Sequence, residues 1–141
     1  MLTTNVDEVF EHSADEIWDL IGDFGDMGRW SGRPPEACVQ DGEGIGCLRT
    51  ITLDDGQKIV DRLEAETALS YSYSIVSAPL PFESYRATMA VEPIDSTSCR
   101  FTWSGEFEPK GIADDKAIQF TQAMYHMGIG LMKDTLAKKA P

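Results

Sequence analysis

The sequence has few cysteines and few histidines, and these shortages argue against disulfide and metal architectures. Cys38, Cys47 and Cys99 are odd in number and have no CxxC spacing, so neither a disulfide framework nor a zinc site is indicated. The two histidines, His12 and His126, are too few to support a His-based metal site. We therefore expect no metal and no other cofactor.

Long apolar runs and positive charge are also lacking. No stretch approaches the roughly 18 continuous apolar residues that a membrane span needs, so we expect no membrane insertion. Residues 1–15 contain acidic side chains and neither a basic nor an apolar signal region, which favours a cytoplasmic location. A net charge of -12 opposes nucleic-acid binding, because proteins that bind nucleic acids place Lys and Arg against the phosphates.

The composition that remains is that of a globular domain. Of the 141 residues, 42% are hydrophobic and 26% are charged, which provides enough apolar material for a core. No linker, internal repeat or low-complexity segment divides the chain. Residues 1–141 are therefore expected to form a single domain.

The N-terminal part predicts one strand followed by short helices. Residues 3–11 combine β-branched and aromatic residues with partial alternation, which indicates a strand. Ser13 and Glu16 form a capping-box pattern that starts a helix, and the glycines that follow end it. A second helical turn is predicted over residues 27–30. The loop at 31–35 contains two prolines, which cannot continue a helix.

The middle of the chain predicts six short strands separated by turns. In residues 69–77 the alternation is almost complete, with Tyr71 and Tyr73 on one face and serines on most of the other. An Asp55-Gly56 pair predicts a hairpin turn. The six predicted strands are 36–41, 46–54, 57–66, 69–77, 84–93 and 98–108.

Residues 113–138 predict one long C-terminal helix. At about 1.5 Å per residue it would be roughly 39 Å long, so it is the element that can cover the sheet. A run of consecutive strands with a helix outside it indicates α+β layering. Apolar or small residues spaced by three and four define its expected inner face, which consists of Ala117, Phe120, Met124, Met127, Gly128, Leu131 and Thr135.

Several segments, taken in order, resemble a known family. They are SADEIWDLIGDFGDMGRW (13–30), GIGCLRTITLDDG (44–56), DRLE (61–64), SYSYSIVSAPLPFESYRATMAVEP (70–93) and FTWSGEFEPKG (101–111). The chain resembles the polyketide cyclase/dehydrase and lipid-transport branch of the START-like superfamily, also called SRPBCC or Bet v 1-like. The resemblance implies a helix-grip fold, in which a seven-stranded curved antiparallel sheet wraps around the long C-terminal helix and encloses a hydrophobic cavity.

The related plant abscisic-acid receptors imply two further correspondences. Leu80 lies in residues 78–82, which match by position a loop that closes the receptors' pocket like a latch. Strand 98–108 has two possible inward faces. Apolarity favours the face that contains Trp103 and Phe107, whereas alignment with the receptors favours the one that contains Ser104 and Glu106, and both alternatives stay open.

A charged pair is expected inside the predicted sheet. Arg49 shares strand parity with Ile51, and Asp61 on the adjacent strand shares parity with Leu63, so the two charged side chains face the core if their apolar neighbours do. A buried Arg must be paired, because an isolated charge in a low dielectric is very costly. The pair either binds a polar group of a ligand or serves as a structural salt bridge that sets strand register.

Aromatic side chains provide further candidates. Tyr85, with Met89 on the same strand face, and Tyr73 on the facing strand could present hydroxyl groups to the cavity, since a buried Tyr usually needs a hydrogen-bond partner. Tyr85 also matches a position that lines the pocket in the family. Trp30 lies beside a Ser-Gly-Arg-Pro-Pro loop and could close the cavity mouth.

The helix is expected to supply the remaining wall. Methionines fit irregular apolar shapes with little strain, so Met124 and Met127 would make an adaptable surface. The full set of predicted ligand contacts is Trp30, Arg49, Ile51, Asp61, Leu63, Tyr73, Leu80, Tyr85, Met89, Phe120, Met124 and Met127.

Three functions are compatible with these features. The first is binding of a small hydrophobic molecule such as a lipid, polyketide or isoprenoid-like compound, by a monomer or weak homodimer. The second is a polyketide cyclase or dehydratase in which Arg49 polarises a carbonyl and Asp61 or Tyr85 moves a proton. The third is a co-chaperone-like interaction module, which requires an exposed apolar patch. Of the three functions, binding has the simplest structural requirement, which is a cavity with one or two polar groups that orient the ligand.

Overall fold

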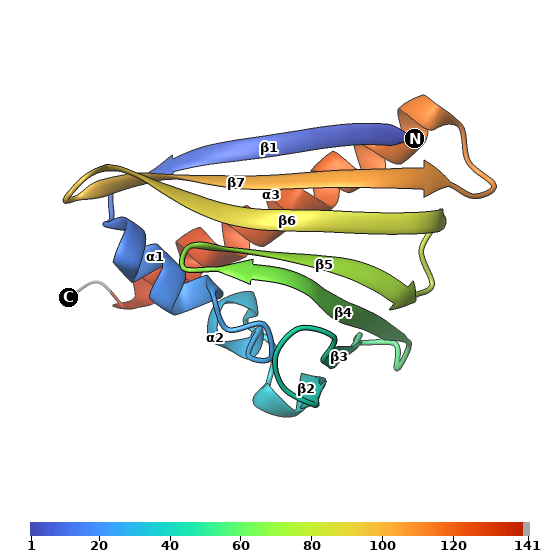
Figure 1. Cartoon of the computed structure of the whole chain (residues 1–141), viewed down its shortest axis with the longest axis horizontal. Helices are drawn as coiled ribbons and strands as arrows, with labels where there is room; N and C mark the ends of the chain where they lie inside the picture. The colour runs from blue at the N-terminus through green and yellow to red at the C-terminus, as the bar shows by residue number, and fades with distance from the viewer. Residues whose placement is uncertain (140–141) are drawn as a thin grey trace.

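One antiparallel sheet of seven strands forms most of the structure, a computed structural model that describes residues 1–139. The strands are β1 Leu2–Phe10, β2 Cys38–Asp41, β3 Leu48–Thr52, β4 Lys58–Thr67, β5 Ser70–Ser77, β6 Phe82–Asp95 and β7 Ser98–Pro109. Their order across the sheet is β1-β7-β6-β5-β4-β3-β2, so β1 lies beside β7 and every other neighbour is consecutive in the chain (Figure 1). The predicted antiparallel sheet of seven strands is confirmed.

Within residues 1–139, four helical segments accompany the sheet. They are α1 Ala14–Ile21, α2 Gly28–Ser31, the 3-10 turn η1 Pro35–Ala37 and α3 Asp114–Lys139. The predicted capping box is present at α1, where the Glu16 backbone N–H donates to Ser13 Oγ and the Ser13 backbone N–H donates to the Glu16 carboxylate. None of the helices within residues 1–139 is both long and apolar enough to cross a membrane.

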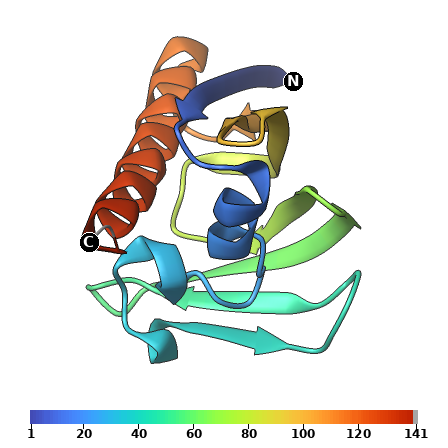
Figure 2. The same ribbon diagram turned by 90° about the vertical axis from the view of Figure 1, so that its left-hand side faces the viewer.

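The curvature of the sheet places α3 along its open side. Turned by 90°, the structure shows a sheet that bends from β1 round to β2, with α3 closing one side (Figure 2). α3 runs along β1 and is held there by Lys133 with Glu8 and by Gln122 with Thr4. Its C-terminal part reaches α2, where Thr135 Oγ1 donates to the Trp30 carbonyl at 3.1 Å. The sheet thus wraps around the helix, as the family resemblance implies.

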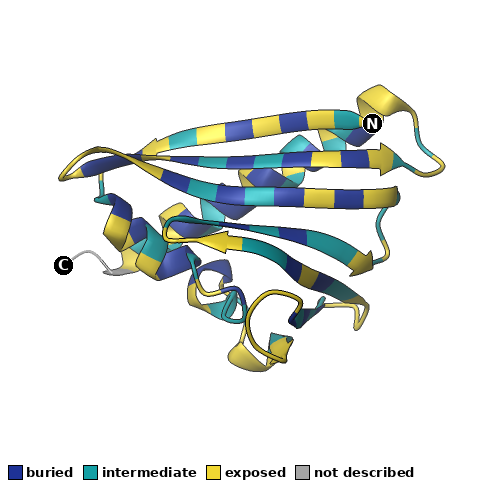
Figure 3. Ribbon diagram, viewed as in Figure 1, coloured by how far each residue is buried: buried dark blue, intermediate teal, exposed yellow. Residues whose placement is uncertain are grey.

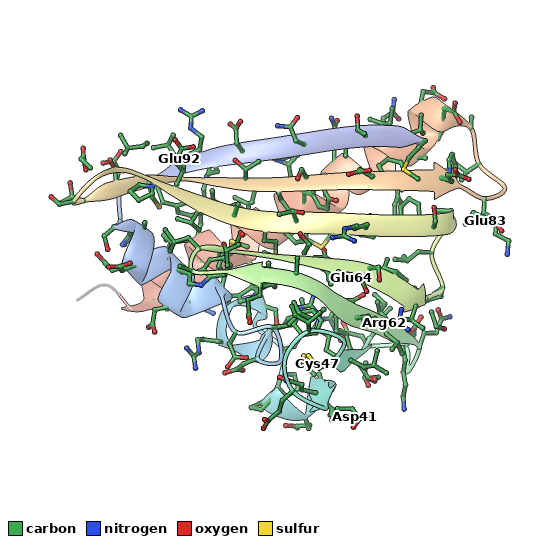
Figure 4. All side chains as sticks on the ribbon, viewed as in Figure 1. Asp41, Cys47, Arg62, Glu64, Glu83 and Glu92 are labelled. Atoms are coloured by element: carbon green, nitrogen blue, oxygen red, sulfur yellow. The ribbon has the colours of Figure 1, made fainter. Side chains whose placement is uncertain are left out.

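Burial alternates along the strands and resolves the ambiguity in β7. Figure 3 shows buried residues alternating with more exposed ones along β6 and β7. Trp103 and Phe107 face the core, whereas Ser104 and Glu106 lie on the outer face. On β4 the outer face carries residues such as Arg62 (Figure 4). The inward face predicted from apolarity is correct, and the inward face predicted from the receptor alignment is wrong. The reason is that burying the large apolar side chains of β7 stabilises the fold more than burying its polar ones.

The inner face of α3 differs from the expected one by a rotation. Met127 is 69% exposed, although it belonged to the expected inner face. Tyr125 instead points inward and stacks on Trp103 with 4.6 Å between ring centroids, and Gly128 lets the Trp103 ring approach the helix. This aromatic contact fixes the rotation. The residues of α3 that are buried are Ala117, Thr121, Tyr125, Gly128, Ile129 and Met132.

Candidate functional site

A cavity of about 140 Å³ lies between the concave face of the sheet and α3. Strands β3 to β7 provide most of its wall, and α2, α3 and the β5–β6 connection complete it. Nine of the predicted contact residues border it, namely Trp30, Arg49, Ile51, Asp61, Tyr73, Leu80, Tyr85, Met89 and Met124.

Three predicted contact residues lie elsewhere. Leu63 is buried in the core but does not border the cavity, and half-buried Phe120 packs on Phe82 with 6.0 Å between ring centroids. Met127 faces outward, so its predicted role as a cavity wall is wrong. The physical reason is the rotation of α3, which gives the inward position to Tyr125.

Five wall residues were not predicted. They are Met27, Ile59, Ile75, Trp103 and Tyr125. Strand parity could have identified two of them, because Ile59 lies two residues from Asp61 and Ile75 lies two residues from Tyr73. A second set of α3 residues at spacings of three and four, which includes Tyr125, was also present in the sequence, but the choice between the two helix faces depends on packing against Trp103.

Arg49 and Asp61 form a buried ion pair. They are cross-strand partners in the β3–β4 register, the Arg49 Nε to Asp61 Oδ2 distance is 2.9 Å, and both residues are 2% exposed. Arg49 Nη1 also donates to the Phe24 carbonyl at 3.0 Å and to the Tyr71 hydroxyl at 3.3 Å. The guanidinium lies over the Phe24 ring at 4.3 Å. These contacts hold Arg49 in one position.

The ionisation of this pair reflects opposing effects. Burial raises the pKa of the Asp61 carboxyl, and the adjacent Arg49 opposes that rise. Burial would lower the pKa of Arg49, but nearby Tyr71 and Asp61 raise it above its ordinary value, so the guanidinium stays charged. Asp61 Oδ1, unlike Oδ2, is buried without a hydrogen-bond partner, and so is Trp30 Nε1.

Three tyrosines that border the cavity, Tyr73, Tyr85 and Tyr125, form what we call the phenol cluster. The Tyr85 and Tyr125 hydroxyls lie 2.5 Å apart, and Trp103 Nε1 donates to the Tyr73 hydroxyl at 3.2 Å. Burial raises the pKa of Tyr73 and Tyr85 well above the ordinary value. The hydroxyls are therefore protonated at neutral pH and can donate hydrogen bonds but cannot act as bases.

The site has the composition of an apolar binding cavity rather than that of a metal centre. Within residues 1–139, no group of three or more His, Cys, Asp or Glu side chains is placed to hold a metal ion. The charged residues of the cavity wall are Arg49 and Asp61. What the wall can do chemically is exclude water, enclose an apolar guest and offer it a small number of hydrogen-bonding atoms.

A curved antiparallel sheet wrapped around a long C-terminal helix is the fold of START-like and Bet v 1-like proteins. The chain belongs to the polyketide cyclase/dehydrase and lipid transport family, whose model matches residues 1–137. The comparison with curated proteins found no match.

Solved structures agree with this assignment. The protein XoxI from Bacillus cereus is 28% identical with a TM-score of 0.85, and the similarity covers 100% of both chains. A START superfamily protein from Mycobacterium smegmatis is 8% identical with a TM-score of 0.81 over 98% of this chain and 99% of that one. The di-domain ARO/CYC protein BexL, from the BE-7585A biosynthetic pathway, is 17% identical with a TM-score of 0.73 over 97% of this chain and 47% of that one. The last two likenesses bear on the fold alone.

Proposed function

We propose that the protein binds a small, mostly apolar molecule in the cavity between the sheet and α3. The observation that carries the proposal is a cavity of about 140 Å³ whose wall is built mainly from Ile, Leu, Met, Trp and Tyr side chains around one paired charge. Ligand sites generally combine an apolar wall with a few polar groups that orient the ligand. The family's description, which includes lipid transport, is consistent with this function.

The size of the cavity limits what it can hold without rearrangement. Drug-sized sites are roughly 300–1,000 Å³, whereas an apolar cavity of about 150 Å³ is known to hold benzene. A guest of about one ring therefore fits the cavity as it stands. A longer lipid, polyketide or isoprenoid requires the wall to move. Met27, Met89 and Met124 are suited to this, because the unbranched Met side chain repacks with little strain.

A cavity-filling substitution tests the proposal. Met124→Trp places a large ring in the cavity, and Met127→Trp makes the same change three residues later on the same helix, where the side chain is 69% exposed. With toluene and indole as probes, thermal shift and calorimetry should show binding to the wild type and to Met127→Trp and its loss in Met124→Trp. Equal binding to all three proteins, or none to the wild type, would contradict the proposal.

Catalysis is a second candidate, favoured by Asp61. A carboxyl group that belongs to a cavity-lining residue, whose pKa is raised by burial and which has one unpaired oxygen, has the features of an acid–base group. Tyr85 is less suited to moving a proton, because its hydroxyl is bonded to Tyr125 and its pKa is raised. The test is turnover of small β-hydroxy ketones: dehydration above the uncatalysed rate that is lost in Asp61→Asn, with binding retained, would support catalysis. If the protein does not raise the rate of product formation above the uncatalysed rate, dehydration of these substrates is excluded.

A further inference from the structure

Two buried polar atoms of the cavity wall lack hydrogen-bond partners. They are Oδ1 of Asp61 and Nε1 of Trp30, and they are the two such side-chain atoms found in the part of the chain that the structure describes. Both residues are 2% exposed, and both border the cavity. Buried polar groups in native proteins are nearly always paired, so these two atoms need a partner from outside the chain, which is either a buried water or a polar group of a guest.

Packing limits the freedom of both atoms to find partners elsewhere. Asp61 Oδ2 is held by Arg49 Nε at 2.9 Å, which leaves Oδ1 as the free carboxylate oxygen. Trp30 is anchored through its carbonyl, which accepts from Thr135 Oγ1. The Trp30 ring packs edge-on against Trp103, with 6.3 Å between centroids and an angle of 82°. Packing therefore fixes both side chains, Asp61 on β4 and Trp30 on α2, and both residues border one cavity.

The chemistry of the two atoms restricts the guest. A carboxylate oxygen accepts a hydrogen bond, and an indole N–H can only donate one. A hydroxyl group does both, since it has one O–H to donate and two lone pairs to accept. A hydroxyl group that reaches both Asp61 Oδ1 and Trp30 Nε1 would satisfy both orphaned atoms, which a hydrocarbon cannot do.

Charge restricts the guest further. The charge of Arg49 is already balanced by Asp61, so an anionic guest would add a second negative charge beside the free oxygen of Asp61. An ammonium group would suit Asp61 but has no lone pair for Trp30. Either ion would also lose its hydration in an apolar cavity, which is very costly. A neutral guest avoids all three penalties.

We propose that the cavity selects a neutral molecule of about one ring that carries a hydroxyl group, such as a phenol or an alicyclic alcohol. The hydroxyl donates to Asp61 Oδ1 and accepts from Trp30 Nε1, and the ring lies among the apolar side chains. This inference rests on the proposed binding function and specifies the ligand class of the same site.

Phenol and toluene make a matched pair of probes, because they differ by a hydroxyl in place of a methyl group. Each is titrated into ¹⁵N-labelled protein while the three indole N–H resonances are followed, with benzoate and benzylammonium as charged probes. Phenol should bind more tightly than toluene and move the Trp30 indole proton downfield, as expected for a new hydrogen bond. The charged probes should bind most weakly.

Trp30→Phe removes the orphaned donor and keeps an aromatic ring, so the variant does not create a new unpaired group. The ratio of phenol affinity to toluene affinity should fall about fivefold, the effect of losing roughly one hydrogen bond. Trp18→Phe is the matched control: Trp18 packs on Tyr71 outside the cavity wall, and its replacement should leave the ratio unchanged.

The possible outcomes separate this inference from the function on which it rests. If toluene binds as tightly as phenol, or if the affinity ratio is the same in Trp30→Phe and wild type, the hydroxyl assignment is wrong while the binding function stands. If benzoate or benzylammonium binds most tightly, the assignment of a neutral guest is wrong. If none of the four probes binds, the proposed function itself fails.

Discussion

The ion pair of Arg49 and Asp61 and the phenol cluster of Tyr73, Tyr85 and Tyr125 both put polar atoms on the cavity, yet they are built differently. In the phenol cluster the hydroxyls are bonded to one another or to Trp103 Nε1. In the ion pair one carboxylate oxygen remains unpaired. In the phenol cluster every hydroxyl oxygen has at least one partner within the protein, whereas in the ion pair one carboxylate oxygen has none and is left free to accept a hydrogen bond.

The largest expected effect comes from breaking the ion pair. Asp61→Leu leaves the Arg49 guanidinium buried without its partner, which should lower the free energy of unfolding by about 3–5 kcal/mol. The double variant Arg49→Met with Asp61→Leu should recover most of this loss, because an apolar pair needs no compensation. Urea unfolding monitored by tryptophan fluorescence measures both.

A second ion pair on the same strand provides the control for that experiment. Glu64 on β4, labelled in Figure 4, pairs with Arg86 at 3.7 Å, and the Arg86 side chain is 52% exposed. Glu64→Ala should change the free energy of unfolding by less than about 1 kcal/mol, as exposed pairs do. A loss in Asp61→Leu no larger than that in Glu64→Ala would show that the buried pair is not the structural element described above.

The second largest effect is expected from glycine substitutions on α3, the helix that carries Tyr125 of the phenol cluster. A Cβ atom at Gly128 would lie 2.5 Å from Cζ3 of Trp103, whose ring is already stacked on Tyr125. Gly128→Ala should therefore lower the free energy of unfolding by about 1–3 kcal/mol through overpacking. At Gly130 a Cβ meets no atom within 4 Å, so Gly130→Ala should raise stability by up to about 1 kcal/mol through helix propensity. Thermal unfolding of the two variants should shift in opposite directions.

A smaller effect is expected within the phenol cluster itself. Tyr85→Phe leaves the Tyr125 hydroxyl without its partner, and Tyr125→Phe does the same to Tyr85, so each should cost about 1–2 kcal/mol. The double variant should cost less than the sum, because it leaves no orphaned hydroxyl. Additive losses in a double-mutant cycle would show that the two hydroxyls do not act as a pair.

The smallest expected effect is a difference in titration between the ion pair and the phenol cluster. The Asp61 carboxyl should titrate above the ordinary Asp range in ¹³C NMR, because burial raises its pKa. A carboxyl whose pKa is raised in the folded state contributes stability below its unfolded pKa and loses that contribution as the pH rises through the folded value. The phenol cluster should not titrate in this range. An Asp61 pKa at or below the ordinary value would show that Arg49 outweighs burial.

Much of this architecture was predictable from local pattern. The capping box of Ser13 and Glu16 marked the start of α1, and alternation marked the inward face of β5. Strand parity brought Arg49 and Asp61 together, because side chains two residues apart share a face and neighbouring strands align their faces. These signals depend on residues that are close in sequence, so they can be recognised before the tertiary structure is known.

The rotation of α3 was not predictable in this way. The helix has two candidate inner faces with similar spacing, one containing Met127 and the other Tyr125. The choice depends on the shape of the facing strand, where Trp103 stacks on Tyr125 and lies against Gly128. Such complementarity joins residues more than twenty positions apart, so no window of sequence contains it.

By itself, the sequence determined the inward face of β5, the start of α1 and the pairing of two charges across β3 and β4, because each follows from periodicity, from capping or from the cost of burying an unpaired charge. The tertiary structure alone decided the volume of the cavity, the face that α3 presents to it and the orphaning of Asp61 Oδ1 and Trp30 Nε1. Those properties arise where distant elements meet, because the space between packed side chains depends on all of its walls at once.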